Sequence, residues 1–241
     1  MLKYPRLFIF GLYATLVSTL GIVYCLFRPV NPENTYFLAR LLGGGFKRIL
    51  GVRVRMINPE YLTQQQPNII IGNHQSNWDM FLWGSFVPKR TVSVGKKEIT
   101  YIPIFGLVYW LAGNVILNRQ SRAKSTSRMG QAAQQIKDRN ISLAMFPEGT
   151  RSRGRGLGPF KKGAFFTAIE AQVPLVPVLS STYTDRLNFN RLHAGEIILK
   201  CYPPIQTNGL EVKHINELTE NTRTFFLQEL DKLNNGAYTN P

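Results

Sequence analysis

The sequence predicts an α/β fold in which a mostly parallel sheet of about seven strands is flanked by helices. Beyond residue 50, short runs rich in β-branched residues alternate with helical stretches, and this alternation is typical of parallel sheets. The 241 residues are enough for one such domain and an N-terminal anchor. The strand-like runs are residues 52–57, 68–71, 91–94, 115–117, 142–146, 175–179 and 196–202.

The helices expected around this sheet follow from the spacing of apolar residues. Between residues 129 and 136 the apolar side chains recur at positions i, i+3, i+4 and i+7, as on one face of a helix. Residues 163–172 form a short Ala-rich stretch that ends before Pro174, and residues 212–233 have one apolar face. In sheets covered on both sides, sites gather at the carboxyl ends of strands, so polar residues that follow the strand-like runs are the functional candidates.

The N-terminal segment predicts a membrane anchor. Residues 7–27 carry no charge and are long enough to cross a hydrocarbon core about 30 Å thick. A secretory signal is the alternative, but no small-x-small cleavage site follows and Arg28 ends the stretch directly. Residues 36–50 are apolar but include three cations and a glycine triplet, which predicts an interfacial helix. The division is therefore an anchor, residues 1–50, and a domain, residues 51–241, which the flanking cations place on the cytoplasmic side.

The charge of the chain indicates an anionic partner. Lys and Arg number 29 against 14 Asp and Glu, a formal charge of +15. Nucleic acid, acidic lipid headgroups, phosphorylated substrates and an acidic carrier protein all fit this excess. Cys25 and Cys201 form no disulfide framework, and the three scattered histidines have no zinc spacing, so the sequence predicts a metal-free protein in a reducing compartment.

The motif at residues 73–79, NHQSNWD, suggests a general base. It follows the strand-like run 68–71, and an imidazole is the side chain best placed to take a proton near neutral pH. A carboxylate on the other ring nitrogen, here from Asp79, would fix the tautomer of His74. Residues five apart lie roughly 140° apart around a helix, so the chain must turn between the two. The alternative is a packed histidine followed by a helix-start aspartate.

A second motif, FPEGTRS at residues 146–152, makes the sequence identifiable. With NHQSNWD before it, and with residues 113–119 and 173–178, it resembles the 1-acylglycerol-3-phosphate acyltransferases of the bacterial PlsC type. The resemblance covers roughly residues 50 to 205. The family motif that corresponds to residues 113–119 usually ends in Asp-Arg. This chain has Asn118-Arg119 there and keeps the arginine.

The resemblance implies an activity and a place in the cell. An acyl group would pass from acyl carrier protein or acyl-CoA to the sn-2 hydroxyl of 1-acyl-glycerol-3-phosphate (lysophosphatidic acid), giving phosphatidic acid in phospholipid biosynthesis. No cofactor, metal or nucleic acid is expected. The resemblance also implies a two-helix anchor, which spans the bilayer or enters one leaflet, in the bacterial inner (cytoplasmic) membrane.

The resemblance further assigns the acceptor site. Arg119 and Arg151 would bind the glycerol phosphate, with Glu148 in the same pocket, and a guanidinium offers a planar fork of donors that matches phosphate oxygens. Gly149 and Thr150 lie between Glu148 and Arg151, where the small glycine permits close approach of the backbone. For the remaining cationic candidates a solvated surface position is the alternative; these are Lys96, Lys97 and Lys161.

Three alternatives stay open at this point. Ser76 could act as a nucleophile, although it lacks the Gly-x-Ser-x-Gly turn that presents such a serine, and direct attack by the acceptor hydroxyl is simpler. The enzyme could act on another lysophospholipid, although two motif arginines favour a phosphomonoester. A non-catalytic basic module would explain the charge and the anchor, but not the His/Asp pair beside two arginine motifs.

Overall fold

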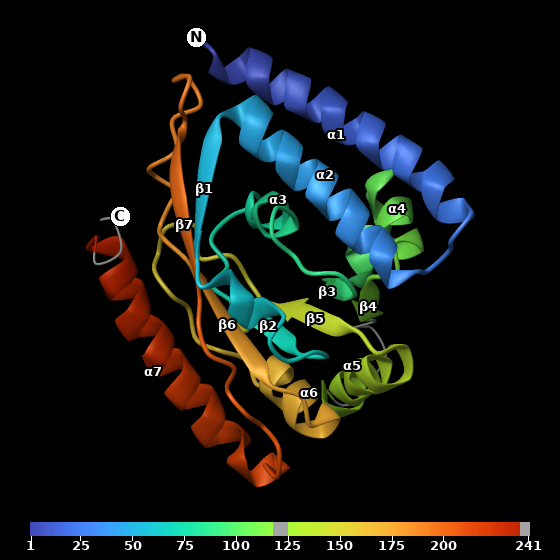
Figure 1. The fold of residues 1–241 in the computed structure, drawn as a ribbon, viewed down its shortest axis with the longest axis vertical. Coiled ribbons are helices and arrows are strands. Elements are labelled where there is room, and N and C mark those ends of the chain that lie inside the picture. Colours follow the sequence, from blue (N-terminus) through green and yellow to red (C-terminus); the bar gives the residue numbers. More distant parts are fainter. Residues whose placement is uncertain (118–124, 237–241) are drawn as a thin grey trace. The chain divides into compact units, whose positions relative to one another are not determined.

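The computed structural model describes residues 1–117 and 125–236, and the chain forms two compact units (Figure 1). The first, here called the helical unit, comprises Met1–Val54, Trp78–Arg122 and Leu187–Glu196. The second, here called the sheet unit, comprises Arg55–Asn77, Ala123–Arg186 and Ile197–Pro241. Strands β1 (Val52–Ile57) and β7 (Gly195–Cys201) each run from one unit into the other. The predicted division into residues 1–50 and 51–241 concerns function and stays a prediction.

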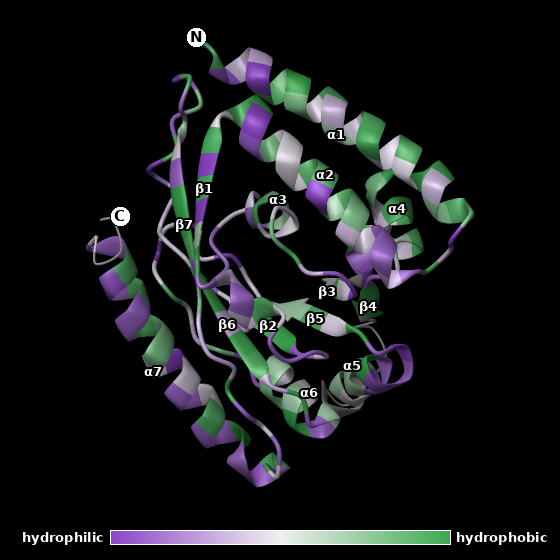
Figure 2. Ribbon diagram, viewed as in Figure 1, coloured by the Kyte–Doolittle hydropathy of each residue, from purple (hydrophilic) through white to green (hydrophobic). Residues whose placement is uncertain are grey.

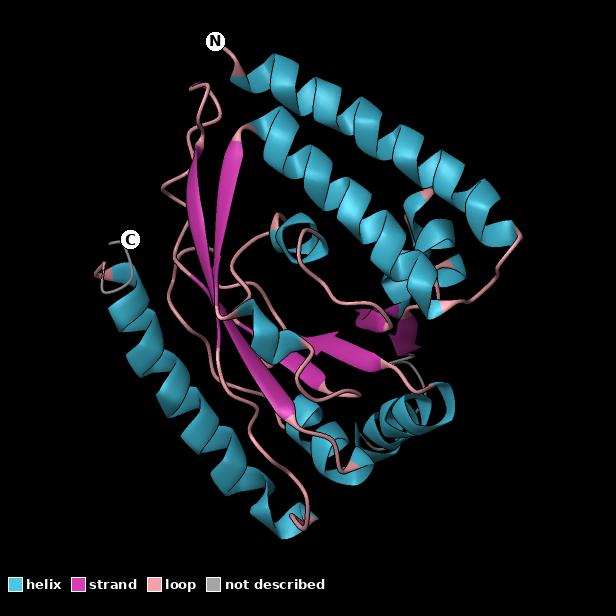
Figure 3. Ribbon diagram, in the orientation of Figure 1, coloured by secondary structure: helices cyan, strands magenta, loops and turns pink. Residues whose placement is uncertain are grey.

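The helical unit is dominated by its first two helices (Figure 3). Helix α2 begins where Asn31 accepts a hydrogen bond from the Glu33 amide and Pro32 takes the first helical position, a typical helix start. The elements of this unit are α1 (Lys3–Leu26), α2 (Pro32–Leu50), α3 (Asp79–Gly84), β3 (Thr91–Lys96), η2 (Lys97–Tyr101), α4 (Phe105–Leu111) and β4 (Val115–Leu117). Strands β3 and β4 pair in parallel.

An aromatic cluster joins α1 and α2 to the first motif. The ring of Trp78 lies 6.0 Å from Phe10 of α1 and 5.7 Å from Phe46 of α2, between ring centroids. Phe81 of α3 lies 4.9 Å from Phe10, and Phe46 is fully buried. Aromatic pairs at such distances stabilise a fold beyond the area that they bury. The N-terminal helices are therefore part of the core that holds Trp78, the residue before Asp79.

Gly43, the first glycine of the triplet in α2, is required for packing. A Cβ on Gly43 would clash with the backbone nitrogen of Ser85, so only glycine lets α2 approach the end of α3 this closely. The Arg40 guanidinium donates to the Ser85 carbonyl at 2.6 Å and so fixes the same contact. This packing explains why an apolar segment with cations and glycines folds against its own protein.

Of the two helices of the predicted membrane anchor, α1 alone is a candidate membrane span. Both helices form, slightly longer than predicted, but among the described helices α1 alone is long and apolar enough to cross a membrane. Only 17% of the most apolar window of α1 is buried, and apolar residues run along its length in Figure 2. The charged residues of α2 lower its hydropathy, and its glycine face is buried. An interfacial position for residues 36–50 stays a prediction.

The sheet unit has a central parallel core. Strand β2 (Ile69–Gly72) is fully buried and pairs in parallel with β5 (Ser142–Met145) on one side and β6 (Leu175–Ser180) on the other. Helix α7 packs on β6 and α6, while α5 packs on α6. The helices of this unit are η1 (Pro59–Leu62), α5 (Ser125–Arg139), α6 (Gly163–Ala171), η3 (Val212–His214) and α7 (Ile215–Asn234).

The number of strands was predicted correctly, but their direction was not. The described residues form seven strands at the predicted places. However, β7 runs antiparallel to β6, so the sheet is mixed rather than mostly parallel. For β7 to run parallel to β6, the chain between them would need a crossover connection of a dozen or more residues, usually a helix. Residues 181–194, which connect the two strands, contain only turns and irregular chain.

The aromatic cluster gives a stability prediction. We expect Phe46→Ala to lower the free energy of unfolding by about 3–5 kcal/mol, because it removes a large ring from a closed site. Phe37→Ala is the matched control, since Phe37 lies on the same helix but is 46% exposed. Thermal or denaturant unfolding of both variants in detergent is the measurement, and equal midpoints would contradict the role given to the cluster.

Candidate active site

The main chain of His74 is fixed by the loop that follows β5. The His74 amide donates to Glu148 Oε1 at 2.7 Å, and the His74 carbonyl accepts from the Ser152 amide at 2.8 Å. The next carbonyl, of Gln75, accepts from the Arg153 amide at 3.1 Å. Because β2 and β5 are neighbouring parallel strands, the chain segments after their carboxyl ends lie close together, as expected for a site in such a sheet.

The residues on either side of His74 point into the protein. Asn73 Nδ2 donates to the Ser180 carbonyl and Asn73 Oδ1 accepts from the Ser180 amide, both at 2.9 Å. Gln75 Nε2 donates to Ser180 Oγ at 2.8 Å and to the Ser181 carbonyl at 3.0 Å. Both amide side chains are buried. The side chain of His74, between them, is only half-buried.

The imidazole of His74 stacks on Phe146. Their ring centroids are 4.1 Å apart and their planes differ by 10°. A stacked ring has little freedom to turn, which is useful for a base that must meet a substrate proton in one direction. The sequence analysis did not single out Asn73, Gln75 or Phe146 as functional. Their position just after strands β2 and β5 could have indicated a role, because polar or aromatic side chains at strand ends often hold neighbouring site residues in place.

Glu148 is a buried carboxylate with main-chain partners. Its Oε1 accepts from the His74 amide and its Oε2 accepts from the Gly158 amide at 2.9 Å. The residue is only 3% exposed. Gly149, which follows it, has a φ of +64°, and a Cβ there would lie 3.0 Å from Lys161 Nζ. Glycine at this position therefore leaves room for the side chain of Lys161, and the role of Gly149 in the acceptor site stays a prediction.

A pocket opens next to His74 in the sheet unit. It is an open hollow of about 290 Å³, lined by Gln75, Ser76, Asn77, Arg151, Arg153 and Thr184. Two guanidinium groups in one pocket favour an anionic ligand, and arginine forks match phosphate oxygens. Arg153 was not predicted as a site residue, although the alternating arginines at 151, 153 and 155 were a signal.

The predicted site residues are distributed over both units. His74, Glu148, Gly149, Thr150, Arg151 and Lys161 all belong to the sheet unit. Asp79, the first residue of α3 and completely buried, belongs to the helical unit, as do Lys96 at the end of β3 and Lys97 at the start of η2. Arg119 lies outside the described residues. The pairing of His74 with Asp79 stays a prediction.

Within the described part of the chain, no three His, Cys, Asp or Glu side chains are placed to hold a metal ion. The geometry places a candidate base, His74, at the end of a strand and next to a pocket whose two arginines favour an anion. A thiolate nucleophile is not offered by Cys201, because burial raises the pKa of its thiol to about 12.

Comparison with known proteins agrees with this geometry. Residues 53–181 match the protein family described as Acyltransferase. The chain is 40% identical over 233 residues to the 1-acyl-sn-glycerol-3-phosphate acyltransferase of Escherichia coli, covering 97% of this chain and 95% of that protein. It is 42% identical over 218 residues to the protein of the same name from Haemophilus influenzae, covering 90% of each.

A solved structure shares the fold. The crystal structure of the 1-acyl-sn-glycerophosphate (LPA) acyltransferase PlsC from Thermotoga maritima aligns with a TM-score of 0.67 at 23% identity, over 93% of this chain and 97% of that one. At this identity the likeness concerns the fold alone. The sequence relatives go further: the chain is an acyltransferase enzyme, and it belongs to the 1-acyl-sn-glycerol-3-phosphate acyltransferase family that its motifs predicted.

Proposed function

We propose that this enzyme transfers an acyl group from a thioester to the sn-2 hydroxyl of 1-acyl-sn-glycerol-3-phosphate, forming phosphatidic acid for phospholipid biosynthesis. The names of the relatives support this acceptor. The observation that carries the proposal is the position of His74, which directly precedes three residues that line the pocket of Arg151 and Arg153. A base and a phosphate site thus lie together after one strand.

In this reaction His74 takes the proton of the acceptor hydroxyl while its oxygen attacks the carbonyl carbon of the thioester. A C–O ester bond forms, the C–S bond breaks, and the imidazolium returns the proton to the leaving thiolate. General-base catalysis of this kind contributes about 10²–10⁴ in rate. Asp79 orients the ring and stabilises the imidazolium. The complete burial of Asp79 supports a fixed rather than a solvated carboxylate.

Arg151 and Arg119 bind the acceptor phosphate, and Arg153 supports them because it lines the same pocket as Arg151. Lys96, Lys97 and Lys161 supply further positive charge. The pocket geometry supports Arg151 most directly.

Glu148 acts on this site through the main chain, since its two oxygens accept from the His74 and Gly158 amides. It thereby holds His74 in place relative to residues 151–158, here called the arginine loop, and Gly149 and Thr150 form the short link to Arg151.

The donor is acyl carrier protein or acyl-CoA, and the reaction as written needs no metal or cofactor. The excess of cations suits either donor, since the carrier protein is acidic and CoA is phosphorylated.

Helix α1 holds the enzyme at the bacterial inner membrane with its site on the cytoplasmic face, and the apolar exposed surface of α1 supports this attachment. A test with labelled thioester and lysophosphatidic acid, against lysophospholipids with larger headgroups, decides the acceptor.

Removal of the base should remove most of the activity. We expect His74→Ala to lower turnover by about 10²–10⁴, since the acceptor hydroxyl then lacks its base. Asp79→Asn should impair turnover as well, because an amide stabilises the wrong tautomer. His193→Ala is the control, as His193 is exposed. Near-normal turnover of folded His74→Ala would sink the mechanism.

The arginines should affect the acceptor rather than the donor. Loss of a hydrogen bond to a charged group costs about 1.5–3 kcal/mol, so Arg151→Ala and Arg119→Ala should each raise the acceptor KM by roughly 10- to 150-fold. Arg151→Lys should rescue only in part, since the fork is lost. Arg186→Ala, at an exposed position, is the matched control. A change confined to the donor KM would assign the arginines to the other substrate.

The role given to Glu148 predicts a loss of stability. In Glu148→Gln an NH₂ group replaces one acceptor oxygen opposite a main-chain donor, so we expect the free energy of unfolding to fall by about 1.5–3 kcal/mol. Glu170→Gln, exposed at the end of α6, should unfold like the unchanged protein. If Glu148→Gln keeps full stability and only the acceptor KM rises, Glu148 contacts the substrate directly.

A further inference from the structure

The helical unit exposes a second apolar surface besides α1. Five large apolar side chains, each between 42% and 65% exposed, lie on η2, on α4 and on the short link between them; they are Tyr101, Ile102, Ile104, Leu107 and Trp110. We call this set the η2–α4 surface. Soluble monomeric proteins seldom expose apolar side chains so close together without a binding role.

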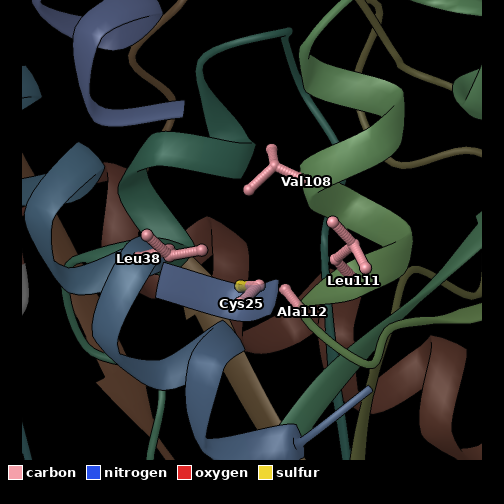
Figure 4. Close-up of a cluster of buried hydrophobic side chains, with 5 residues drawn as sticks. All are labelled: Cys25, Leu38, Val108, Leu111 and Ala112. Atoms are coloured by element: carbon pink, nitrogen blue, oxygen red, sulfur yellow. The ribbon is translucent and has the colours of Figure 1, made fainter. Parts of the chain in front are cut away.

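The outward direction of these side chains is fixed by packing on the other face of α4. Val108 and Leu111 are buried in a cluster with Cys25 of α1 and Leu38 of α2 (Figure 4). Tyr109 is buried as well, and its hydroxyl hydrogen bonds Ser93 Oγ at 2.7 Å. Since one face of the helix is held by α1, α2 and β3, its other face cannot turn inward.

The sequence around this surface has the character of a lipid-facing segment. Residues 99–117 contain no charged side chain, and Lys96, Lys97 and Glu98 precede them with a net positive charge. Trp and Tyr are enriched where membranes meet water, and cations next to such a segment favour anionic headgroups. Helices α1 and α4 also pack on each other, and Val17, Ile22 and Tyr24 of α1 border the cluster that buries the inner face of α4.

We propose that the η2–α4 surface is a second membrane-contact site, which lies in the headgroup and outer acyl region of an anionic bilayer beside α1. Helix α4 has seven residues, about 10 Å at 1.5 Å per residue, so it cannot cross a core of about 30 Å and lies at the interface. A single helix leaves a protein free to rotate about the helix axis. A second contact beside it fixes which side of the helical unit faces the lipid.

The test is a depth measurement on the full chain in vesicles, because deletion of α1 would also remove Phe10 from the aromatic core. Nitroxide labels are attached at Leu107→Cys and, separately, at Trp110→Cys. Leu16→Cys on α1 is the lipid reference and Leu227→Cys on α7, 42% exposed, is the matched aqueous reference. The unchanged chain gives the background, since Cys25 and Cys201 are both fully buried.

In vesicles of phosphatidylcholine and phosphatidylglycerol, collision rates of each label with oxygen and with a water-soluble nickel chelate are compared. We expect the oxygen-to-nickel ratio at positions 107 and 110 to exceed that at 227 several-fold and to lie below that at 16. Ratios equal to that at 227 would overturn the proposal, and would leave a protein partner as the occupant of this surface. The readout needs no turnover, so it is independent of the proposed reaction.

Discussion

The site depends on one buried carboxylate that accepts hydrogen bonds from the main chain of two separate loops. Glu148 accepts a hydrogen bond from the backbone amide of His74, which follows β2. It accepts a second one from the backbone amide of Gly158, at the far end of the arginine loop. Burial of a carboxylate costs several kcal/mol unless its oxygens are satisfied, and here both oxygens have partners. The Ser152 amide returns a bond to the His74 carbonyl. These hydrogen bonds join the two loops. They therefore hold the main chain of His74 in a constant position relative to the loop that carries the pocket arginines.

The same principle holds the other side of the histidine. Asn73 pairs with both main-chain groups of Ser180, and Gln75 continues the contact to Ser181. Polar side chains thus extend the pairing of β2 with β6 beyond the last strand residues. Buried amides that are fully paired restrict a loop to one conformation, whereas unpaired ones would destabilise it. His74 consequently stands on a rigid main chain although it lies outside regular structure.

Sequence reasoning found what is local and missed what depends on distant partners. The seven strands follow from runs of β-branched residues, and His74 and Glu148 follow from motifs directly after such strands. The antiparallel direction of β7 was missed because strand composition carries no direction, and only the helix-free segment 181–194 hinted at it. The burial of α2 was missed because its glycines have meaning only beside Ser85 of α3. Arg153 and Phe146 were missed as site residues because their neighbours come from other strands. Nothing in the described structure tests Arg119.

Two faces of helix α1 have different surroundings in the helical unit. Helix α1 exposes apolar side chains on one face, while Phe10 on another face packs against Trp78. Arg6, which looks like a simple flanking charge in the sequence, donates to the carbonyls of Arg191 and Leu192 and so fixes the start of α1 to the protein. Trp78 in turn precedes Asp79, the carboxylate expected to orient the base. To extract an acceptor whose acyl tail lies in the bilayer costs about 0.8 kcal/mol per CH₂. An enzyme avoids this cost if its site meets the acceptor at the membrane surface. In this chain the apolar helix α1 packs against Trp78, the residue directly before α3.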